Sequence, residues 1–427
     1  MKVIEYPQRA DWKEILKRPS FDVTTLFDTV RAVLDTVRKE GDKALKAYEL
    51  QFDKVELGSL EVTASEMIAA EGQLSVELCE AIRLAYSNIS KFHKAQVFTP
   101  ITVETQPGVT CCQRAVPIEK VGLYIPGGTA PLFSTVLMLA TPAKIAGCKE
   151  IILCTPPNRE GKVNPAILFA AQTAGVSRVF KVGGSQAIAA MAYGTESVPQ
   201  VDKIFGPGNQ YVTAAKQLVS LSDVAIDMPA GPSEVEVLAD EFSNPTFVAA
   251  DLLSQAEHGA DSQVLLVSTS RTLLHKVQAE VEVQLARLPR RALAEKALAN
   301  SRLVLVKDLD EAIDLTNAYA PEHLVLANET YREVAERITH AGSVFLGKYS
   351  CESAGDYASG TNHTLPTKGY AKAYSGLCLD SFVRKITFQE ITAQGVRSIG
   401  RTVELMASGE QLEAHRNAMT VRLESLG

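Results

Sequence analysis

Residues 121–128 read VGLYIPGG, a short apolar run that stops at a proline and two glycines. Three more apolar runs, each followed by a Gly or Pro cluster, come after it at residues 151–154, 179–182 and 204–205. Segments of helical length separate these runs. Strand, turn and helix in this order predict consecutive βαβ units in a parallel sheet, whose strands are buried on both faces and therefore read as unbroken apolar stretches.

The pattern extends to both sides of this region. Apolar residues at helical spacing over 27–37 predict an amphipathic helix, and after Phe382 the pattern predicts helices only. We therefore expect an α/β protein with two doubly wound parallel sheets and a small helical C-terminal unit. The strands of the second sheet are predicted at residues 235–238, 264–267, 303–306 and 344–346.

The composition excludes several classes of protein. Of 427 residues, 46% are hydrophobic and 22% charged, which is typical of a folded globular protein and not of a disordered one. Such a length predicts about two to four domains. Lys and Arg number 43 against 50 Asp and Glu, a net charge of -7, so the chain lacks the basic excess that nucleic-acid binding requires.

The sequence also argues against a membrane or secreted protein. No apolar run reaches the roughly 18 residues that a membrane span needs, and the N-terminus has no apolar core of a signal peptide. The seven cysteines have no regular spacing, which favours free thiols. We expect a cytoplasmic protein.

Glycine-rich loops at the strand ends are the first candidate site. Ligands of open parallel sheets bind outside the carboxyl ends of the strands, where residues 124–128, 183–186 and 206–209 are expected to lie. The second of these loops leads into a predicted helix over 187–193, whose N-H groups suit a phosphate. A dinucleotide fits this arrangement. The G-x-G-x-x-G fingerprint is absent, so plain βα turns remain an alternative.

Histidines form the second candidate site. Gln255 and His258 are three residues apart, so on a helix ended by Gly259 both would point to one face and share a metal. Glu322 and His323 are adjacent and offer two proton-transfer groups. The structural alternatives are a hydrogen-bonded Gln beside a surface His, and a helix-start Pro-Glu pair followed by a partly buried His.

Two further stretches carry polar side chains that bear on a metal site. Residues 351–363 form a turn-rich stretch with Asp356 and His363, which leaves room for a ligand or is a solvated loop. Glu410 and His415 lie on the C-terminal helical unit, which by itself is an exposed helix.

Taken together, four of these side chains form a nitrogen-and-oxygen ligand set without thiolate. Such a set is compatible with Zn²⁺ when the substrate completes the coordination, and also with Mn²⁺ or Co²⁺. The absence of a C-x-x-C pair argues against a closed structural zinc site. The four residues are Gln255, His258, Asp356 and His415.

Ordered motifs run along essentially the entire chain. They are VGLYIPGG at 121–128, GPGN at 206–209, AGPSEV at 230–235, SQAEH at 254–258, APEH at 320–323, GDY at 355–357 and TNHTLPT at 361–367. Through these motifs the sequence resembles the histidinol dehydrogenase family. The resemblance implies oxidation of L-histidinol to L-histidine through L-histidinaldehyde with two NAD⁺, in the last steps of histidine biosynthesis, and one Zn²⁺ per subunit.

The resemblance also implies roles for single residues. Glu322 and His323 would be the catalytic residues. The NAD-binding residues would be Tyr124, Gln186 and Asn209. The zinc ligands would be Gln255, His258, Asp356 and His415, all of which would also bind substrate. The other substrate-binding residues would be Ser233, His323, His363 and Glu410, with Glu322 acting on the substrate.

The implied architecture is two incomplete Rossmann-like domains, one inserted in the other, with small helical terminal units. The first domain would comprise 21–123 and 233–378, and the second, NAD-binding domain 124–232. Residues 1–20 would form an N-terminal arm. A C-terminal tail, 379–427, would be swapped in a homodimer and place His415 in the partner's zinc site. The swap would explain why a metal ligand lies near the chain end, where a monomer would normally fray.

Three other functions remain open from the sequence. A related zinc and NAD dehydrogenase would act on another small alcohol, such as a sulfonated propanediol. A zinc hydrolase would use Glu322 and a zinc-bound water, with the glycine loops holding a substrate phosphate, and would not need NAD. A binding protein with a vestigial site would bind histidinol or nucleotide without producing NADH.

Overall fold

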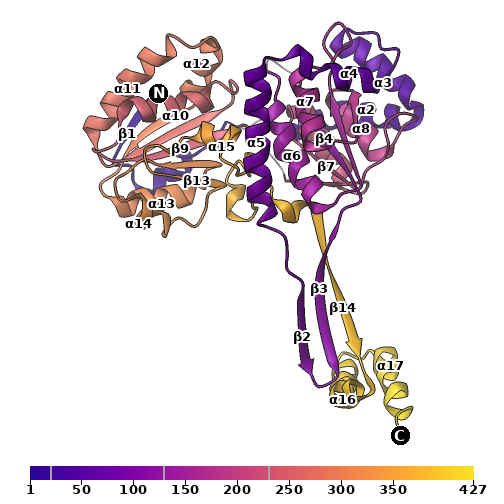
Figure 1. The fold of residues 1–427 in the computed structure, drawn as a ribbon. Helices are drawn as coiled ribbons and strands as arrows, with labels where there is room; N and C mark the ends of the chain where they lie inside the picture. The colour runs from indigo at the N-terminus through magenta and orange to yellow at the C-terminus, as the bar shows by residue number, and fades with distance from the viewer. Residues whose placement is uncertain (20–21, 128–129, 229–230) are drawn as a thin grey trace.

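The computed structural model describes residues 1–19, 22–127, 130–228 and 231–427. Gly128 and Ala230 of the quoted motifs, and the expected boundary at residues 20 and 21, lie outside the described residues. Two α/β bodies lie side by side, and a long arm projects from one of them (Figure 1). Among the described residues no helix combines the length and apolar character that a membrane crossing requires.

The first body contains a five-stranded sheet in the order β6-β5-β4-β7-β8, and all of its pairs are parallel. Its four longer strands confirm the four predicted runs. Its strands are β4 (Lys120–Tyr124), β5 (Glu150–Thr155), β6 (Arg178–Lys181), β7 (Lys203–Phe205) and β8 (Ala225–Ile226). The helices between them are α6 (Phe133–Ala146), α7 (Pro165–Ala174), α8 (Gly184–Tyr193) and α9 (Gln210–Ser220).

The second body contains a six-stranded sheet in the order β1-β11-β10-β9-β12-β13, again with parallel pairs only. Its strands are β1 (Lys2–Glu5), β9 (Glu234–Ala239), β10 (Gln263–Ser268), β11 (Arg302–Leu305), β12 (His323–Leu326) and β13 (Ser343–Leu346). Its helices are α10 (Pro245–Ala256), α11 (Arg271–Leu285), α12 (Arg291–Ala299), α13 (Leu309–Tyr319), α14 (Tyr331–Ala335) and α15 (Glu352–Tyr357).

Both sheets are covered on two faces, as a doubly wound sheet requires. Along β5, Ile151 and Leu153 enter one hydrophobic core, whereas Ile152 and Cys154 enter another. The six-stranded sheet likewise separates two cores. The α/β class with two Rossmann-like parallel sheets is therefore confirmed.

The N-terminal helices differ from the expected domain division. They are α2 (Phe27–Glu40), α3 (Asp42–Tyr48), a π-helix (Glu49–Asp53), α4 (Ala64–Ala69) and α5 (Val76–Lys94). We expected 21–123 to share a domain with 233–378, but the apolar faces of these helices pack in the cores of the five-stranded sheet. The expected arm 1–20 instead supplies β1, because its backbone pairs with β11. The predicted helix over 27–37 is confirmed within α2.

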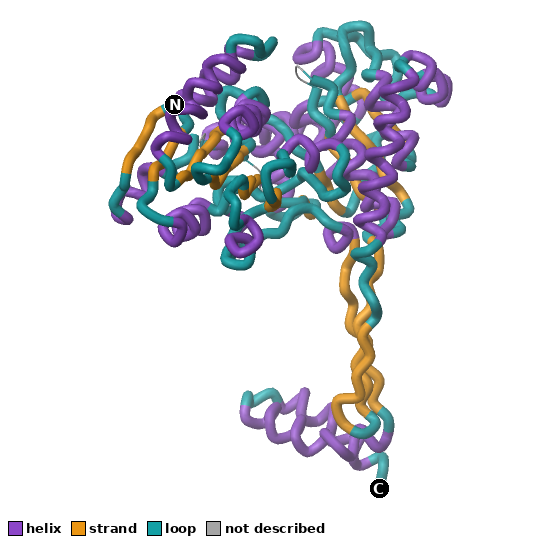
Figure 2. The backbone as a smooth tube through the Cα atoms, turned by 60° about the vertical axis from the view of Figure 1, so that its left-hand side comes forward, coloured by secondary structure: helices purple, strands orange, loops and turns teal. Residues whose placement is uncertain are grey.

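The projecting arm is a three-stranded antiparallel sheet with two helices at its end (Figures 1 and 2). Its elements are β2 (Ile101–Gln106), β3 (Val109–Pro117), β14 (Val383–Ile391), α16 (Ala393–Gly409) and α17 (Glu413–Glu424). The prediction of helices only after Phe382 was wrong for β14. Ile386, Thr387 and Phe388 are β-branched or aromatic residues that favour a strand, and β3 supplies their hydrogen-bonding partner.

The remaining elements are short. They are the helix α1 (Trp12–Ile15) and the 3₁₀ turns Arg9–Asp11, Val23–Leu26, Glu71–Gln73, Tyr370–Lys372 and Leu379–Phe382. All seven cysteines are free thiols.

Candidate active site

A cavity of about 150 Å³ lies between the two bodies. The first body contributes Thr135 of α6 and Pro207, which follows the carboxyl end of β7. The second body contributes residues at the amino ends of its strands, such as Ser233 before β9 and His323 at the start of β12. The five-stranded sheet therefore faces this cavity with the carboxyl ends of its strands, which we call its carboxyl edge. The six-stranded sheet faces it with the amino ends of its strands, its amino edge.

Glu322 and His323 are both buried and are held by the backbone of one residue, Glu234. The Glu234 N-H donates to Glu322 Oε2 at 2.8 Å, and the Glu234 carbonyl oxygen lies 3.1 Å from His323 Nδ1. Because a carbonyl only accepts, Nδ1 must carry the proton in this contact. The neutral imidazole then has its lone pair on Nε2, the nitrogen that a general base requires.

The ring nitrogen Nε2 of His323 faces Asp356. The distance from Nε2 to Asp356 Oδ1 is 3.4 Å, and both atoms are buried without a hydrogen-bond partner among the described residues. Burial lowers the pKa of His323, but the negative charges of Glu322 and Glu352 outweigh burial and hold this pKa well above its usual value. For Glu322, burial is the main cause and raises the pKa. These carboxylates favour the protonated imidazole of His323, and a cation bound beside them would favour the neutral form that a base requires.

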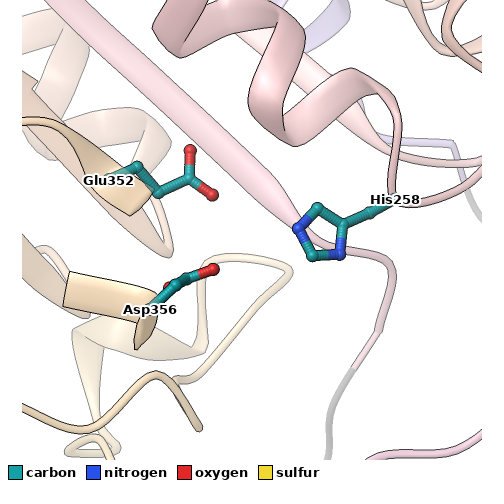
Figure 3. Close-up of side chains that lie close together, drawn as sticks. All are labelled: His258, Glu352 and Asp356. Carbon is teal, nitrogen blue, oxygen red and sulfur yellow. The ribbon is translucent and has the colours of Figure 1, made fainter. Parts of the chain in front are cut away.

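Three side chains converge beside this pair and could hold a metal ion. One ligand atom from each of His258, Glu352 and Asp356 lies within 4.8 Å of the others (Figure 3). His258 is exposed, but desolvation by the surrounding groups still lowers its pKa, which favours the neutral imidazole that binds metals. The unpartnered Asp356 oxygen and this mixture of nitrogen and oxygen donors fit a divalent cation of the zinc type.

Gln255 lies at the same place, and the orientation of its amide that satisfies both ends gives each end one partner. Its Nε2 donates to Glu352, and its Oε1 accepts from the Glu234 N-H at 2.9 Å. The expected helix is α10, but it ends at Ala256, so His258 lies in the turn beyond it. The prediction that one helix face presents both side chains was wrong, although both line the cavity.

Glu352 is the residue that sequence reasoning missed. It is buried, and burial raises its pKa to about 8. Residues 351–363 were predicted as a turn-rich loop, whereas 352–357 form α15, which places Glu352 and Asp356 four residues apart on one helical face. That spacing was the available signal.

Ser233 and His363 also line the cavity. His363 Nδ1 lies 3.0 Å from the carbonyl oxygen of Asp356, and its Nε2 lies 3.1 Å from Thr135 Oγ1. Burial lowers the pKa of His363. This neutral imidazole therefore links α15 of the second body to α6 of the first across the site.

A larger cleft, of about 660 Å³, continues from the cavity along the first body. It is lined by Asn209, whose Oδ1 caps α9 by accepting from the N-H groups of Tyr211 and Val212 at 3.0 and 3.1 Å. Ser233 and His258 line both spaces. The glycine loop after β7 and the candidate metal ligands therefore line one continuous space.

Tyr124 and Gln186, the other expected NAD contacts, have buried side chains. The hydroxyl of Tyr124 accepts from Gly184 N-H at 3.0 Å, and Gln186 Nε2 donates to Glu49 at 3.0 Å. Glu49 also accepts from Gly183 N-H, and burial raises its pKa to about 7. Two N-H groups of the loop expected to bind phosphate therefore donate to side chains of the protein.

Glu410 and His415 are not brought to this cavity within the chain. Glu410 caps the end of α16, His415 lies on α17, and both residues are exposed. These two helices lie at the end of the arm (Figure 1). Their expected contacts with substrate and metal stay predictions.

Comparison with known proteins identifies similar chains over the full length. The sequence profile of the histidinol dehydrogenase family matches residues 16–423. The histidinol dehydrogenase of Bacteroides thetaiotaomicron is 68% identical over 426 residues, which is 100% of both chains. That of Escherichia coli is 53% identical over 417 residues, covering 97% of this chain and 95% of the relative.

A solved structure shows the same fold. The crystal structure of histidinol dehydrogenase from Elizabethkingia anophelis superposes with a TM-score of 0.98 at 54% identity. The match covers 100% of this chain and 98% of that one.

Proposed function

The chain belongs to the histidinol dehydrogenase family, and we propose that it oxidises L-histidinol to L-histidine through L-histidinaldehyde, using two NAD⁺ and one zinc ion per subunit. The observation that carries the proposal is the buried pair Glu322 and His323, which lies beside a cluster of metal-type ligands in one cavity. The reaction would be the last two oxidations of histidine biosynthesis, in the cytoplasm.

The zinc ion would be held by Gln255, His258 and Asp356 of one chain and by His415 of a second chain, with Glu352 close by. When bound, it would orient the imidazole and amine nitrogens of histidinol and would supply positive charge beside His323. The chain's own contribution is orientation, because the cavity of about 150 Å³ leaves little freedom to a small substrate.

The proton steps follow from the geometry of the acid-base pair. His323 removes the hydroxyl proton through Nε2 while the first hydride leaves for NAD⁺, since Nδ1 is fixed as the donor to Glu234. The aldehyde must be hydrated before a second hydride can leave. Glu322, whose pKa is raised by burial, would deprotonate the attacking water. As the hydrate forms, His323 returns the proton from the first step to the carbonyl oxygen of the aldehyde, and it then takes a hydroxyl proton of the hydrate during the second hydride transfer.

No cysteine takes part in this scheme, so no covalent thiohemiacetal is proposed. The aldehyde stays in the cavity between the two oxidations, which the restricted access of water favours. NAD⁺ would lie along the cleft of about 660 Å³, near Asn209, with Tyr124 and Gln186 shaping the loops beneath it.

The arm supports a homodimer. All six residues of β2 are exposed, β14 has no buried residue, and none of the residues of α17 is buried. A three-stranded sheet with almost no buried side chain is marginal in water, and exposed apolar side chains such as Phe388, Leu405 and Met406 need a partner surface. We propose that this surface is a second subunit, whose zinc site His415 completes.

Subunit mixing tests the shared site. Coexpression of His415→Asn and Glu322→Gln chains should restore about a quarter of wild-type activity, because half of the dimers are mixed and each then has one intact site. Each variant alone should be nearly inactive in the complete oxidation. If the mixture is no more active than its components, His415 does not act across the interface.

The proposed reaction is tested by NADH absorbance with limiting L-histidinol. We expect two NADH per histidinol and complete loss of turnover with a chelator. One NADH per histidinol would contradict the four-electron reaction. Faster turnover of an alcohol without an imidazole would indicate the related dehydrogenase, product formed without NAD⁺ would indicate a hydrolase, and binding without NADH would indicate a vestigial site.

A further inference from the structure

One backbone segment positions three groups of the site at once. Besides holding Glu322 and His323, the N-H of Glu234 is 2.9 Å from Oε1 of Gln255. A shift of this residue would therefore move the base, the water-activating carboxylate and a proposed metal ligand together. The contacts that hold Glu234 in place therefore help to set the positions of the reacting groups.

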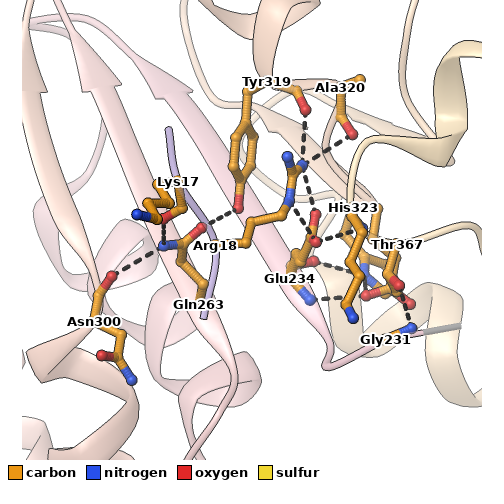
Figure 4. Close-up of polar contacts among 12 residues, drawn as sticks. Lys17, Arg18, Gly231, Glu234, Gln263, Asn300, Tyr319, Ala320, His323 and Thr367 are labelled. Carbon is orange, nitrogen blue, oxygen red and sulfur yellow. Dashed lines mark hydrogen bonds and ion pairs between the residues drawn. The ribbon is translucent and has the colours of Figure 1, made fainter. Parts of the chain in front are cut away.

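The side chain of Glu234 is held by Arg18, which lies 216 positions away in the sequence. The guanidinium donates through Nε to Oε1 at 2.6 Å and through Nη2 to Oε2 at 2.8 Å, a two-point contact that fixes the carboxylate in angle as well as in distance (Figure 4). Lys368 N-H donates to the same Oε1 at 2.6 Å. Only 15% of the Arg18 side chain and 3% of the Glu234 side chain are exposed.

Arg18 also holds the turn that leads into the catalytic pair. Its Nη2 donates to the carbonyl oxygens of Tyr319 and Ala320, at 2.7 and 3.3 Å, and the guanidinium lies 3.9 Å from the centre of the Tyr319 ring. Ala320 has a φ of 54°, in the left-handed region that a non-glycine residue rarely adopts. This conformation redirects the chain from α13 to Glu322, and the contact with Arg18 stabilises it.

The segment that carries Arg18 is itself tied to the sheet. Gln263 Nε2 donates to the carbonyl oxygens of Lys17 and Asn300, both at 3.0 Å, and Gln263 Oε1 accepts from the Tyr319 hydroxyl at 2.9 Å (Figure 4). Arg18 therefore connects the start of β9 to the end of α13, and its own segment is fixed to the sheet.

We propose that Arg18 is a positioning residue for the oxidation, which acts through Glu234 to hold Glu322 and His323 in their reactive geometry. The proposal rests on the proposed function above. Arg18 lies behind the catalytic pair and does not line the cavity. Its loss should therefore slow turnover without weakening the binding of histidinol to the same degree.

A matched control is available in the other body. Arg178 donates to both oxygens of Glu61 at 2.8 and 2.7 Å, donates to the carbonyl oxygen of Ser197 at 3.1 Å, and lies 4.9 Å from the centre of the Phe180 ring. It repeats the contacts of Arg18 but lines neither the cavity nor the cleft.

The test compares Arg18→Met with Arg178→Met in kcat, in KM for histidinol and NAD⁺, in melting temperature and in metal content. We expect Arg18→Met to lower kcat about 10- to 100-fold while KM for histidinol changes by less than about threefold, since a misplacement of this kind acts on the transition state. Arg18→Lys should recover part of kcat, because it keeps the charge and loses the fork. Arg178→Met should lower the melting temperature but leave kcat within about twofold.

A double-mutant cycle tests whether Arg18 acts on the reaction through Glu234. When Glu234→Gln is already present, adding Arg18→Met should lower kcat by less than about threefold, because the carboxylate that Arg18 holds has already been replaced. The proposal would be overturned if Arg18→Met lowered kcat by the same factor with and without Glu234→Gln. It would also be overturned if Arg18→Met and Arg178→Met had equal kcat. If Arg18→Met does not fold, Arg18→Lys and Glu234→Gln carry the same comparison. A wild-type protein that makes no NADH from histidinol would instead overturn the proposed function.

Discussion

The two sheets offer opposite edges to the same cavity, and their edges are built from different residues. The five-stranded sheet presents carboxyl ends with glycine and proline loops, such as 206–208. The six-stranded sheet presents amino ends whose side chains are buried and ionisable, including Glu234, Glu322 and His323. One edge leaves space for a ligand, and the other supplies acids, bases and the candidate metal ligands.

Backbone chemistry explains this division. An N-H group at the amino end of a strand that is not paired in the sheet can hold a carboxylate, as the N-H of Glu234 holds Glu322. At the other edge, Gly206 has a φ of 120°, and a Cβ there would collide with the carbonyl of Tyr124. Catalytic side chains are thus expected on the six-stranded edge and cofactor contacts on the five-stranded edge.

The largest expected effect comes from the amino edge. Glu322→Gln should slow oxidation of histidinaldehyde by about 100- to 10,000-fold and oxidation of histidinol by about tenfold or less, because only the aldehyde step needs water to be deprotonated. Single-turnover rates with each substrate measure this difference. Equal losses in both steps would remove the role assigned to Glu322.

A smaller effect is expected at the carboxyl edge. Asn209→Ala should raise KM for NAD⁺ about tenfold and leave kcat at saturating NAD⁺ within about threefold, as expected for a group that binds without taking part in the reaction. Because Asn209 also caps α9, Asn209→Ser is the control: it keeps a capping oxygen and removes the amide. If both variants lower kcat and leave KM for NAD⁺ unchanged, the carboxyl edge does not bind the cofactor in the way proposed.

The smallest effect concerns stability. Burial raises the pKa of Glu236 from 4.5 to about 8, partly opposed by a hydrogen bond from Thr316. A carboxyl that binds its proton more tightly when folded destabilises the protein as pH rises from about 4.5 to about 8. Glu236→Gln should remove this slope, which amounts to a few kcal/mol of unfolding free energy. Urea unfolding at pH 5 and pH 8 checks it, and an unchanged slope would contradict the assignment.

The strands of both sheets were largely predictable, because strands buried on two faces show as unbroken apolar runs. β12 was not predicted, since its four residues begin at His323 and follow a proline that suggests a helix start. β1 was missed because a strand at a sheet edge needs its partner β11 to be recognised. In each case the deciding interaction is distant in sequence.

The candidate site shows the same limit. Residue types and motifs pointed to Gln255, His258 and Asp356, which the structure brings together. They did not point to Glu352, whose helical turn was interpreted as a loop, nor to Arg18, whose contact with Glu234 leaves no periodic pattern. Long-range ion pairs of this kind are visible only in the fold.

We propose that the amino edge of the six-stranded sheet holds one divalent cation on which turnover depends. The decisive measurement is metal analysis of the purified protein, followed by titration of zinc into chelator-treated protein. We expect one ion per chain, activity that rises until one equivalent is bound, and no bound ion in His258→Asn. Active protein that contains no ion and gains nothing from added zinc would contradict it.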